Sequence, residues 1–232
     1  MPKSGTNKQI VISLGGSLIV PEQGIDRQFL TDFRQLILKE SRKGRKFFLV
    51  VGGGTTARHY IKALEGIIKA DNKQKDWLGI YSTHLNAHFL RLIFGRYAFG
   101  KIVKSPKTKV FSSKKIIIAG GWRPGSSTDY VAVLIAQRYK SKTIINLSNI
   151  DYLYTADPRK DKNAKRIEKI SWKNFRELVG RKWRPGLNSP FDPVASKKAQ
   201  ELGLRVIIMN GRNLKNLENY LSEKPFKGTI ID

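Results

Sequence analysis

Short apolar runs alternate with longer segments of helical periodicity along the whole chain. Six runs rich in Val, Ile, Leu and Phe have the length and composition of buried β-strands. They cover residues 9–14, 47–51, 116–119, 143–147, 206–209 and 229–231. The segments between them space their apolar residues at three and four positions, which predicts amphipathic helices. The first of these helices begins after Asp26. The others cover residues 55–68, 77–94, 128–139, 172–179, 194–202 and 214–221.

Strands that alternate with helices indicate βαβ units, and such units build a mainly parallel sheet covered by helices on both faces. The 232 residues, 40% of them hydrophobic, suffice for one large α/β domain. The sequence has no internal repeat and no linker that splits it, so we predict a single domain over residues 1–232. Three segments are less regular. We predict loops at 71–76 and 181–193, the latter mobile, and a short strand with a surface loop at 101–114.

Glycines follow three of the predicted strands, as Gly15-Gly16, Gly52-Gly53-Gly54 and Gly120-Gly121. Without a Cβ the backbone can adopt positive φ and approach a ligand closely. A helix that follows such a turn offers free N–H groups and the positive end of its dipole to an anion. Because the carboxyl ends of parallel strands share one edge of a sheet, the three turns together predict a phosphate-bearing ligand there.

The loop after the predicted strand 143–147 adds nucleotide-binding chemistry to that edge. Residues 148–158 read Ser-Asn-Ile-Asp-Tyr-Leu-Tyr-Thr-Ala-Asp-Pro and offer amide, hydroxyl, aromatic and carboxylate groups. The P-loop pattern Gly-x-x-x-x-Gly-Lys-Ser/Thr is absent from the sequence, which excludes that class. Residues 52–57 fit the dinucleotide pattern Gly-x-Gly-x-x-Ala, but Asp71 and Asp76 do not follow a strand as that pattern requires. We interpret this match as accidental.

Composition and charge set further bounds. The absence of cysteine excludes disulfides and cysteine zinc sites. No apolar run approaches the roughly 20 residues that span a bilayer, and residues 1–8 lack the apolar core of a signal peptide, so we expect a cytoplasmic protein without a membrane partner. The net charge of +26 permits nucleic-acid, acidic-membrane or anionic-substrate binding. Basic clusters at 39–46, 101–115, 159–169 and 181–184 are expected on solvated surfaces. Since no nucleic-acid motif accompanies them, we do not expect nucleic acid to be the main partner.

Three histidines and an aromatic series are weaker candidates. His84 and His88 stand four apart on a predicted helix and could share a metal, but no third ligand is evident, so a surface or interface role is expected. His59 is expected to be structural. Aromatic residues at roughly helical spacing predict core or subunit contacts; they are Trp77, Tyr81, Phe89 and Phe94.

Four blocks of the sequence, in order and spacing, resemble the amino-acid kinase superfamily, and most closely the archaeal-type UMP kinases. They are Ser-Leu-Gly-Gly-Ser at 13–17, Val-Gly-Gly-Gly at 51–54 with Arg58, Gly-Gly-Trp-Arg-Pro-Gly-Ser-Ser-Thr-Asp at 120–129, and residues 148–158. A weaker fifth block is Phe-Asp-Pro-Val-Ala-Ser-Lys at 191–197. The resemblance implies a three-layer αβα sandwich that transfers the γ-phosphoryl group of ATP to UMP. It places the acceptor mainly against residues 1–140 and ATP mainly against residues 141–232.

The resemblance also implies roles for individual residues. The ATP-binding residues would be Gly15, Gly16, Ser17, Gly54, Arg58, Ser148, Asn149, Tyr154 and Asp157. The UMP-binding residues would be Gly53, Asp76, Gly121, Trp122, Arg123, Pro124, Gly125, Ser126, Ser127 and Thr128. The catalytic residues would be Asp129, Lys197 and Arg58, although Asp129 could instead cap a helix or complement its dipole. Mg²⁺ would be carried by ATP with no metal site on the protein, and the assembly would be a homohexamer.

The chain departs from the family pattern at several positions. Ser13 stands where many members of the superfamily, though not the archaeal-type UMP kinases, have lysine. Tyr152 stands where glycine is usual, and Ser148 where threonine is common. Trp122 and Arg123 replace smaller or different residues. These departures keep two alternatives open: a relative with another acceptor, such as isopentenyl phosphate, and a nucleotide-binding storage protein that has lost kinase activity.

Overall fold

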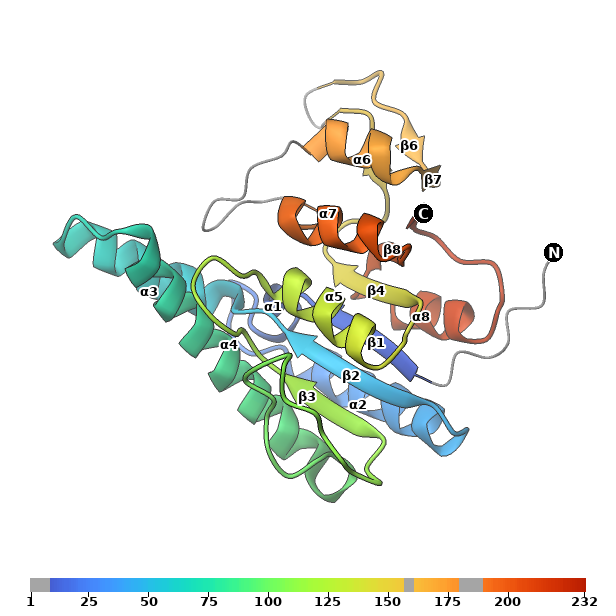
Figure 1. Cartoon of the computed structure of the whole chain (residues 1–232), viewed down its shortest axis with the longest axis horizontal. Coiled ribbons are helices and arrows are strands. Elements are labelled where there is room, and N and C mark those ends of the chain that lie inside the picture. The colour runs from blue at the N-terminus through green and yellow to red at the C-terminus, as the bar shows by residue number, and fades with distance from the viewer. Residues whose placement is uncertain (1–8, 157–160, 180–189) are drawn as a thin grey trace.

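A seven-stranded sheet forms the centre of the molecule. The computed structural model describes residues 9–156, 161–179 and 190–232 (Figure 1). The strand order is β3-β2-β1-β4-β8-β9-β7, and all neighbours are parallel except the pair β8 and β9. The bounds are β1 Gln9–Leu14, β2 Lys46–Val51, β3 Ile116–Ala119, β4 Thr143–Ser148, β7 Lys169–Ile170, β8 Arg205–Asn210 and β9 Thr229–Ile231. The predicted mainly parallel α/β sheet is confirmed.

Helices cover both faces of this sheet. One apolar core joins it to α1 (Gly16–Ile19), α2 (Arg27–Arg42), α4 (Asn72–Phe94) and α8 (Leu214–Leu221). A second core joins the other face to α5 (Thr128–Arg138), α6 (Trp172–Val179) and α7 (Pro193–Glu201). In Figure 1, α5 lies in front of the strands and α2 behind them. The three-layer αβα sandwich is therefore confirmed.

Alternation along the strands explains why both faces need a cover. On β1, Ile10, Ile12 and Leu14 belong to the first core, whereas Val11 belongs to the second. Successive side chains of a strand point to opposite faces, so a continuous apolar run can be buried only between two layers. This is the physical reason that the strands read as unbroken apolar segments.

Helix α4 begins five residues earlier than the sequence predicted. The polar run 71–76 was expected to be a loop, and from Asn72 onward this is wrong. Asp71 caps the helix: its side chain accepts from the Gln74 amide at 2.7 Å, and the Gln74 side chain accepts from the Asp71 amide at 2.9 Å. This capping box lies before a solvated first turn, so the turn carries no apolar stripe to reveal it.

The remaining differences concern short or irregular segments. Residues 101–114 form no strand; a β-bridge joins Val103 to Ala119 of β3, and the rest is a surface loop. The hairpin of β5 (Leu153–Tyr154) with β6 (Arg166–Ile167) was not predicted. The predicted mobile loop 181–193 lies largely outside the described residues.

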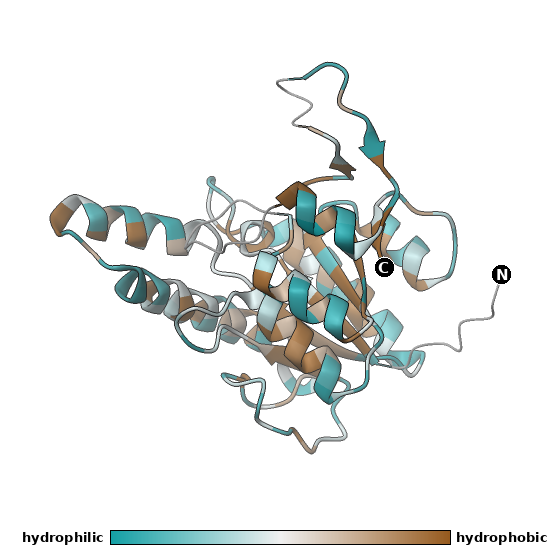
Figure 2. Cartoon of the chain, turned by 45° about the horizontal axis from the view of Figure 1, so that its top comes forward, coloured by the Kyte–Doolittle hydropathy of each residue, from teal (hydrophilic) through white to brown (hydrophobic). Residues whose placement is uncertain are grey.

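Helices α3 (Gly54–Ile67) and α4 form an arm that extends beyond the body in both views (Figures 1 and 2). Large apolar side chains are exposed along one side of α4: Trp77, Tyr81, Leu85 and Leu92. The opposite side, which includes Ala87, Leu90 and Phe94, is buried in the core. Helix α4 is thus apolar on two sides but covered on one. Among the described residues, no helix is long and apolar enough to cross a bilayer.

Candidate active site

The glycine turns after β1 and β2 are in direct contact. A Cβ added to Gly16 would lie 2.1 Å from the Gly54 nitrogen, and one added to Gly54 would lie 2.4 Å from the Gly16 oxygen. Gly54 also has a φ of +62°, which side chains disfavour. The Gly52 amide donates to the Leu14 oxygen at 2.9 Å. The two turns therefore fit together only as glycines, and they bring the N-termini of α1 and α3 to one edge of the sheet.

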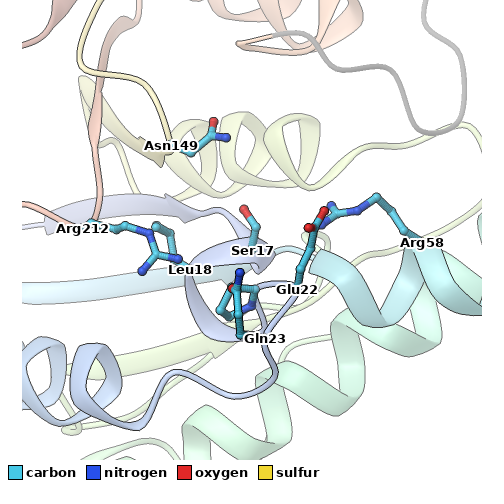
Figure 3. Close-up of a pocket in the computed structure, with 8 residues that line it drawn as sticks. Ser17, Leu18, Glu22, Gln23, Arg58, Asn149 and Arg212 are labelled. Atoms are coloured by element: carbon cyan, nitrogen blue, oxygen red, sulfur yellow. The ribbon is translucent and has the colours of Figure 1, made fainter.

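A pocket of about 250 Å³ opens beside these turns. Of the predicted ATP-binding residues, it brings together Ser17, Arg58 and Asn149. Figure 3 shows Arg58 and Arg212 on opposite sides of Ser17, with Asn149 above it. The Arg58 guanidinium donates to the Thr55 hydroxyl at 2.6 Å. Residues from both halves of the chain thus build this pocket, because β1 and β4 are neighbours in the sheet.

Arg212 is a pocket residue that the sequence reasoning missed. Its guanidinium donates to the Asp26 carboxylate at 2.9 Å, which fixes the side chain against the start of α2. The Gly211 amide donates to the Ser148 oxygen at 2.8 Å, so the loop after β8 meets the loop after β4. Ligands bind at the carboxyl ends of parallel strands, and this arginine follows the carboxyl end of β8, so the sequence did contain a signal for it. The other lining residues not predicted are Leu18, Pro21, Glu22 and Gln23.

The other residues predicted for ATP lie at the end of β4 and beyond it. Ser148 is the last residue of β4, and Tyr154 lies in β5 opposite Arg166 of β6. Tyr152, one of the departures from the family pattern, has the Arg166 guanidinium carbon 5.5 Å from its ring centroid. Of the described residues that line the pocket, none comes from β5, so the structure does not bring Tyr154 together with Asn149 there. Asp157 lies outside the described residues.

Helix α4 holds the loop predicted to bind UMP. The Gly125 amide donates to the Asp76 carboxylate at 2.7 Å. Burial raises the pKa of Asp76, while this hydrogen bond and the charge of Lys75 oppose the rise. About two helical turns farther along α4, the Gly121 amide donates to the Thr83 hydroxyl at 2.7 Å. Two predicted acceptor residues, Asp76 and Gly125, are thus in contact.

His84 also positions this loop. Its Nε2 donates to the Gly121 oxygen at 2.8 Å, and burial lowers the pKa of the imidazole. His84 is thus half-buried and contacts the loop, whereas His88 is exposed. No group of three His, Cys, Asp or Glu that could hold a metal occurs in the described part of the chain.

Asn86 connects the same helix to the second glycine turn. Its side-chain amide donates to the Gly52 oxygen at 2.9 Å and to the Gly53 oxygen at 3.1 Å. A Cβ on Gly53 would lie 2.7 Å from the Ala57 Cβ, so this glycine is also tightly enclosed. The sequence offered no pattern that could have found Asn86, because an asparagine on a helix is usually solvated.

The middle of the predicted acceptor loop carries Trp122 and Arg123. The Arg123 guanidinium carbon lies 4.2 Å from a Trp122 ring centroid, and Trp122 packs partly buried against the second core. The chain then turns through Pro124, Gly125 and Ser126 to the start of α5. The Ser127 hydroxyl caps α5 by accepting from the Tyr130 amide at 3.1 Å, and Thr128 is the first helical residue.

Asp129 lies in the first turn of α5, and its carboxylate receives three hydrogen bonds. Its carboxylate accepts from the Ser13 hydroxyl at 2.8 Å, the Asn146 side chain at 3.2 Å and the Asp192 amide at 3.1 Å. Burial raises the pKa of Asp129 to about 6; the Ser13 hydrogen bond lowers it and the charge of Asp192 raises it. Since Ser127 is the cap, a capping role for Asp129 is wrong, while a first-turn carboxylate does complement the dipole.

Comparison with known proteins assigns the chain to a family. The model of the amino acid kinase family matches residues 8–210. The chain belongs to the amino acid kinase family. Within it, a protein named uridylate kinase from Methanospirillum hungatei is 38% identical over 225 residues, covering 96% of this chain and 94% of that one. Another of that name from Pyrococcus abyssi is 32% identical over 227 residues, covering 97% and 99%.

Solved structures of the amino acid kinase fold agree with this one. The crystal structure of uridylate kinase from Archaeoglobus fulgidus has a TM-score of 0.79 at 29% identity and covers 96% of this chain and 99% of that one. UMP kinase from Bacillus anthracis has a TM-score of 0.75 at 20% identity, with 97% and 96% covered, which shows the shared fold.

The family departure at Ser13 has a structural counterpart. Where many members of the amino acid kinase family have a lysine, this chain places a hydroxyl that donates to Asp129. Lys197, which with Arg58 was predicted to be a catalytic cation, is exposed on α7. No described contact joins Lys197 to Asp129. Helix α7 itself is tied to Asp129 through the Asp192 amide. The structure therefore brings the start of α7, the helix that carries Lys197, to the site.

Proposed function

We propose that this chain is a UMP kinase that transfers the γ-phosphoryl group of ATP to UMP, giving UDP and ADP. The observation that carries the proposal is the arrangement at the carboxyl edge of the sheet. The pocket of Ser17, Arg58 and Asn149 includes residues next to the glycine turns, and α4, which holds the predicted acceptor loop through Asp76, contacts the second turn through Asn86. Relatives named uridylate kinase support UMP as the acceptor.

On the donor side, ATP would occupy the pocket between Arg58 and Arg212. Two guanidinium groups on opposite sides of Ser17 suit a polyphosphate, because each can donate several hydrogen bonds to anionic oxygens. The N-termini next to Gly15, Gly16 and Gly54 add backbone N–H donors. Ser148, Tyr154 and Asp157 would contribute to the base and ribose. Because this pocket is lined by six residues of 1–140 and two of 141–232, ATP would lie against both halves of the chain.

On the acceptor side, Asp76 would hold the ribose and residues 121–128 would enclose the uracil. The contact of Asp76 with the Gly125 amide supports this, because one carboxylate oxygen is already used to fix the loop while the other can accept from a ribose hydroxyl. Gly53 would face the UMP phosphate at the second glycine turn.

Transfer between two phosphates needs alignment and charge neutralisation more than covalent help from the protein. Arg58, backbone N–H groups and Lys197 would supply positive potential. A Mg²⁺ ion carried by ATP would neutralise charge on the phosphates. Asp129 would orient Ser13, Asn146 and the start of α7 around the transferred group.

We further propose a homo-oligomer, by resemblance a homohexamer built from dimers, that works in the cytoplasm where ATP and UMP are found. The exposed apolar side of α4 supports self-association. Trp77, Tyr81, Leu85 and Leu92 fall on one helical face and would otherwise remain in water.

A coupled assay of ADP release with UMP, CMP, AMP and isopentenyl phosphate tests the function. We expect turnover with UMP. Turnover of isopentenyl phosphate with none of UMP would contradict the proposal and favour the alternative acceptor, and no turnover with any acceptor would favour a storage protein.

Asp76→Ala should raise KM for UMP at least about tenfold while leaving KM for ATP nearly unchanged, since one charge-assisted hydrogen bond is lost. Equal effects on both substrates would refute the assignment of Asp76.

A further inference from the structure

A long part of the chain carries positive charge without any acidic residue. From Trp77 to Thr128 the sequence contains no Asp or Glu. Within it, Lys101, Lys104, Lys107 and Lys109 are all exposed on the surface loop beside β3. An ammonium group with no acidic neighbour keeps its full field, so this loop is a strong local source of positive potential.

Two other basic clusters, as far as the structure describes them, differ in this respect. In the cluster 39–46, Lys39 pairs with Glu218 at 2.6 Å, and Lys43 and Arg45 both pair with Glu40. In the described part of 159–169, Arg166 pairs with Glu168 and Lys169 with Asp232. No ion pair between described residues involves a lysine of the loop beside β3. A general excess of lysine therefore does not explain this loop, because elsewhere the excess is partly neutralised.

The loop is also held in a defined shape. Ile102, Val103, Pro106 and Val110 are buried between the exposed lysines. The Arg138 side chain donates to the Pro106 oxygen at 2.7 Å, and the Val110 amide donates to the Tyr139 hydroxyl at 2.9 Å. Buried anchors that alternate with lysines fix the backbone and leave the ammonium groups in solvent. The cations are thus arranged before any partner binds, which lowers the entropic cost of binding.

Aromatic rings lie among these cations. Phe111 is 80% exposed, and the Lys109 ammonium lies 4.8 Å from its ring centroid. At the other end, the Lys107 ammonium lies 5.6 Å from a Trp122 ring centroid. A solvated phenylalanine next to a lysine has no packing role in the chain itself. Although the Lys109 ammonium lies over the ring, the side chain is exposed enough for a flat partner to reach it.

We propose that residues 101–111, the lysine loop, bind single-stranded nucleic acid, with the lysines on phosphates and Phe111 stacked on a base. Cations that follow a backbone, combined with exposed aromatic rings, are the two parts of sequence-independent single-strand binding. An acidic membrane fits less well, since it would need several exposed apolar side chains or an amphipathic helix, and Phe111 is the large apolar side chain exposed on this fully described loop. The proposed site is separate from the ATP pocket, which other residues line, and it meets the predicted UMP loop at Trp122.

The test measures binding of a fluorescent single-stranded RNA, longer than about 16 nucleotides, to the full chain by anisotropy over a range of salt. Each lost phosphate contact lowers the steepness of log K against log salt by about 0.7. The triple variant Lys104→Gln, Lys107→Gln, Lys109→Gln should therefore lose about 2 in slope. The matched control is Lys162→Gln, Lys165→Gln, Lys173→Gln, which removes the same charge from exposed positions near β6 and α6.

The proposal holds if the lysine-loop variant loses slope and affinity while the control keeps both. Equal losses in the two variants would overturn it, because they would show a general charge effect. Phe111→Ala should weaken binding roughly tenfold, whereas Phe111→Trp should keep the parent affinity, because it retains an aromatic ring. An unchanged affinity of Phe111→Ala would contradict the proposed stacking. Complete displacement of RNA by UMP with ATP, or binding only to acidic vesicles and not to RNA, would also overturn it.

Discussion

At the scale of single residues, Asp129 is the group with the most demanding environment. Its buried carboxylate accepts hydrogen bonds from residues of β1, β4 and the start of α7. Burial is the main reason that its pKa is raised to about 6. Its role as an organiser of these elements requires the charged form, since the carboxylate accepts from all three. Keeping a buried carboxylate ionised at neutral pH costs stability, as is common at functional sites.

The raised pKa makes a prediction about stability and pH. The folded chain binds more protons than the unfolded chain between pH about 4 and about 6, so the contribution of Asp129 to the free energy of unfolding falls as pH rises through that window. Asp129→Asn should lack this fall, and relative to the parent it should gain on the order of 2 kcal/mol from pH 4 to pH 7. Urea unfolding at several pH values measures it. A difference between the two proteins that is the same at every pH would contradict the assigned pKa.

Arg212 gives a second prediction at this scale. Because its guanidinium lines the proposed ATP pocket, Arg212→Ala should raise KM for ATP about tenfold and leave KM for UMP unchanged. Arg205→Ala is a matched control, since Arg205 also pairs with an aspartate, Asp232, but does not line the pocket. Steady-state kinetics with each substrate varied would measure this. Equal behaviour of the two variants would show that Arg212 only stabilises the fold.

At the scale of elements, the turns after β1 and β2 determine where the helices start. Gly16 and the segment 52–54 approach more closely than any side chain allows. The same contact aligns α1 and α3, which contribute Ser17 and Arg58 to the pocket. A contact between two loops therefore sets the geometry of the proposed phosphate path.

A pair of glycine substitutions tests this contact. Gly16→Ala should lower the free energy of unfolding by several kcal/mol and abolish activity, because its Cβ would collide with backbone atoms of Gly54. Gly66→Ala is the control: this glycine lies in α3 with open space around it, so alanine should stabilise the helix by up to about 1 kcal/mol. Thermal unfolding and the ADP-release assay report both effects. A Gly16→Ala protein with normal stability would show that the turns can separate.

At the scale of the whole molecule, the arm of α3 and α4 leaves an apolar face in solvent. The net charge of +26 opposes association of copies, so a stable assembly requires compensating apolar burial. The exposed side of α4 offers such area, and a two-fold pairing of identical faces would bury it twice.

Leu85→Glu should therefore shift the assembly to a smaller species, because it places a charge in the middle of that face. Ile25→Glu is the control, since Ile25 is also exposed but lies on the loop before α2. Light scattering coupled to size-exclusion chromatography measures the mass of each protein. Dissociation by both variants, or by neither, would move the proposed interface away from α4.

The sequence by itself determined six strands of the seven-stranded sheet, most helices and the edge of the sheet that carries the site; β7 was not predicted. Buried strands and amphipathic helices leave local patterns, since side-chain burial repeats every two or 3.6 residues. The glycine turns were visible because only glycine tolerates their backbone, and the blocks around them indicated the family. Elements without a local pattern were missed: the solvated first turn of α4 and the short pair β5 and β6.

Only the tertiary structure decided which side chains meet. Arg212 reaches the pocket because β8 lies next to β4, and His84 and Asn86 hold the glycine loops because α4 crosses the ends of β2 and β3. The same holds for the exposed side of α4 and for the unpaired lysines beside β3. These facts depend on contacts between residues far apart in sequence, which no window of neighbouring residues contains. Periodicity therefore fixes which face of an element is apolar, and packing alone fixes what that face touches.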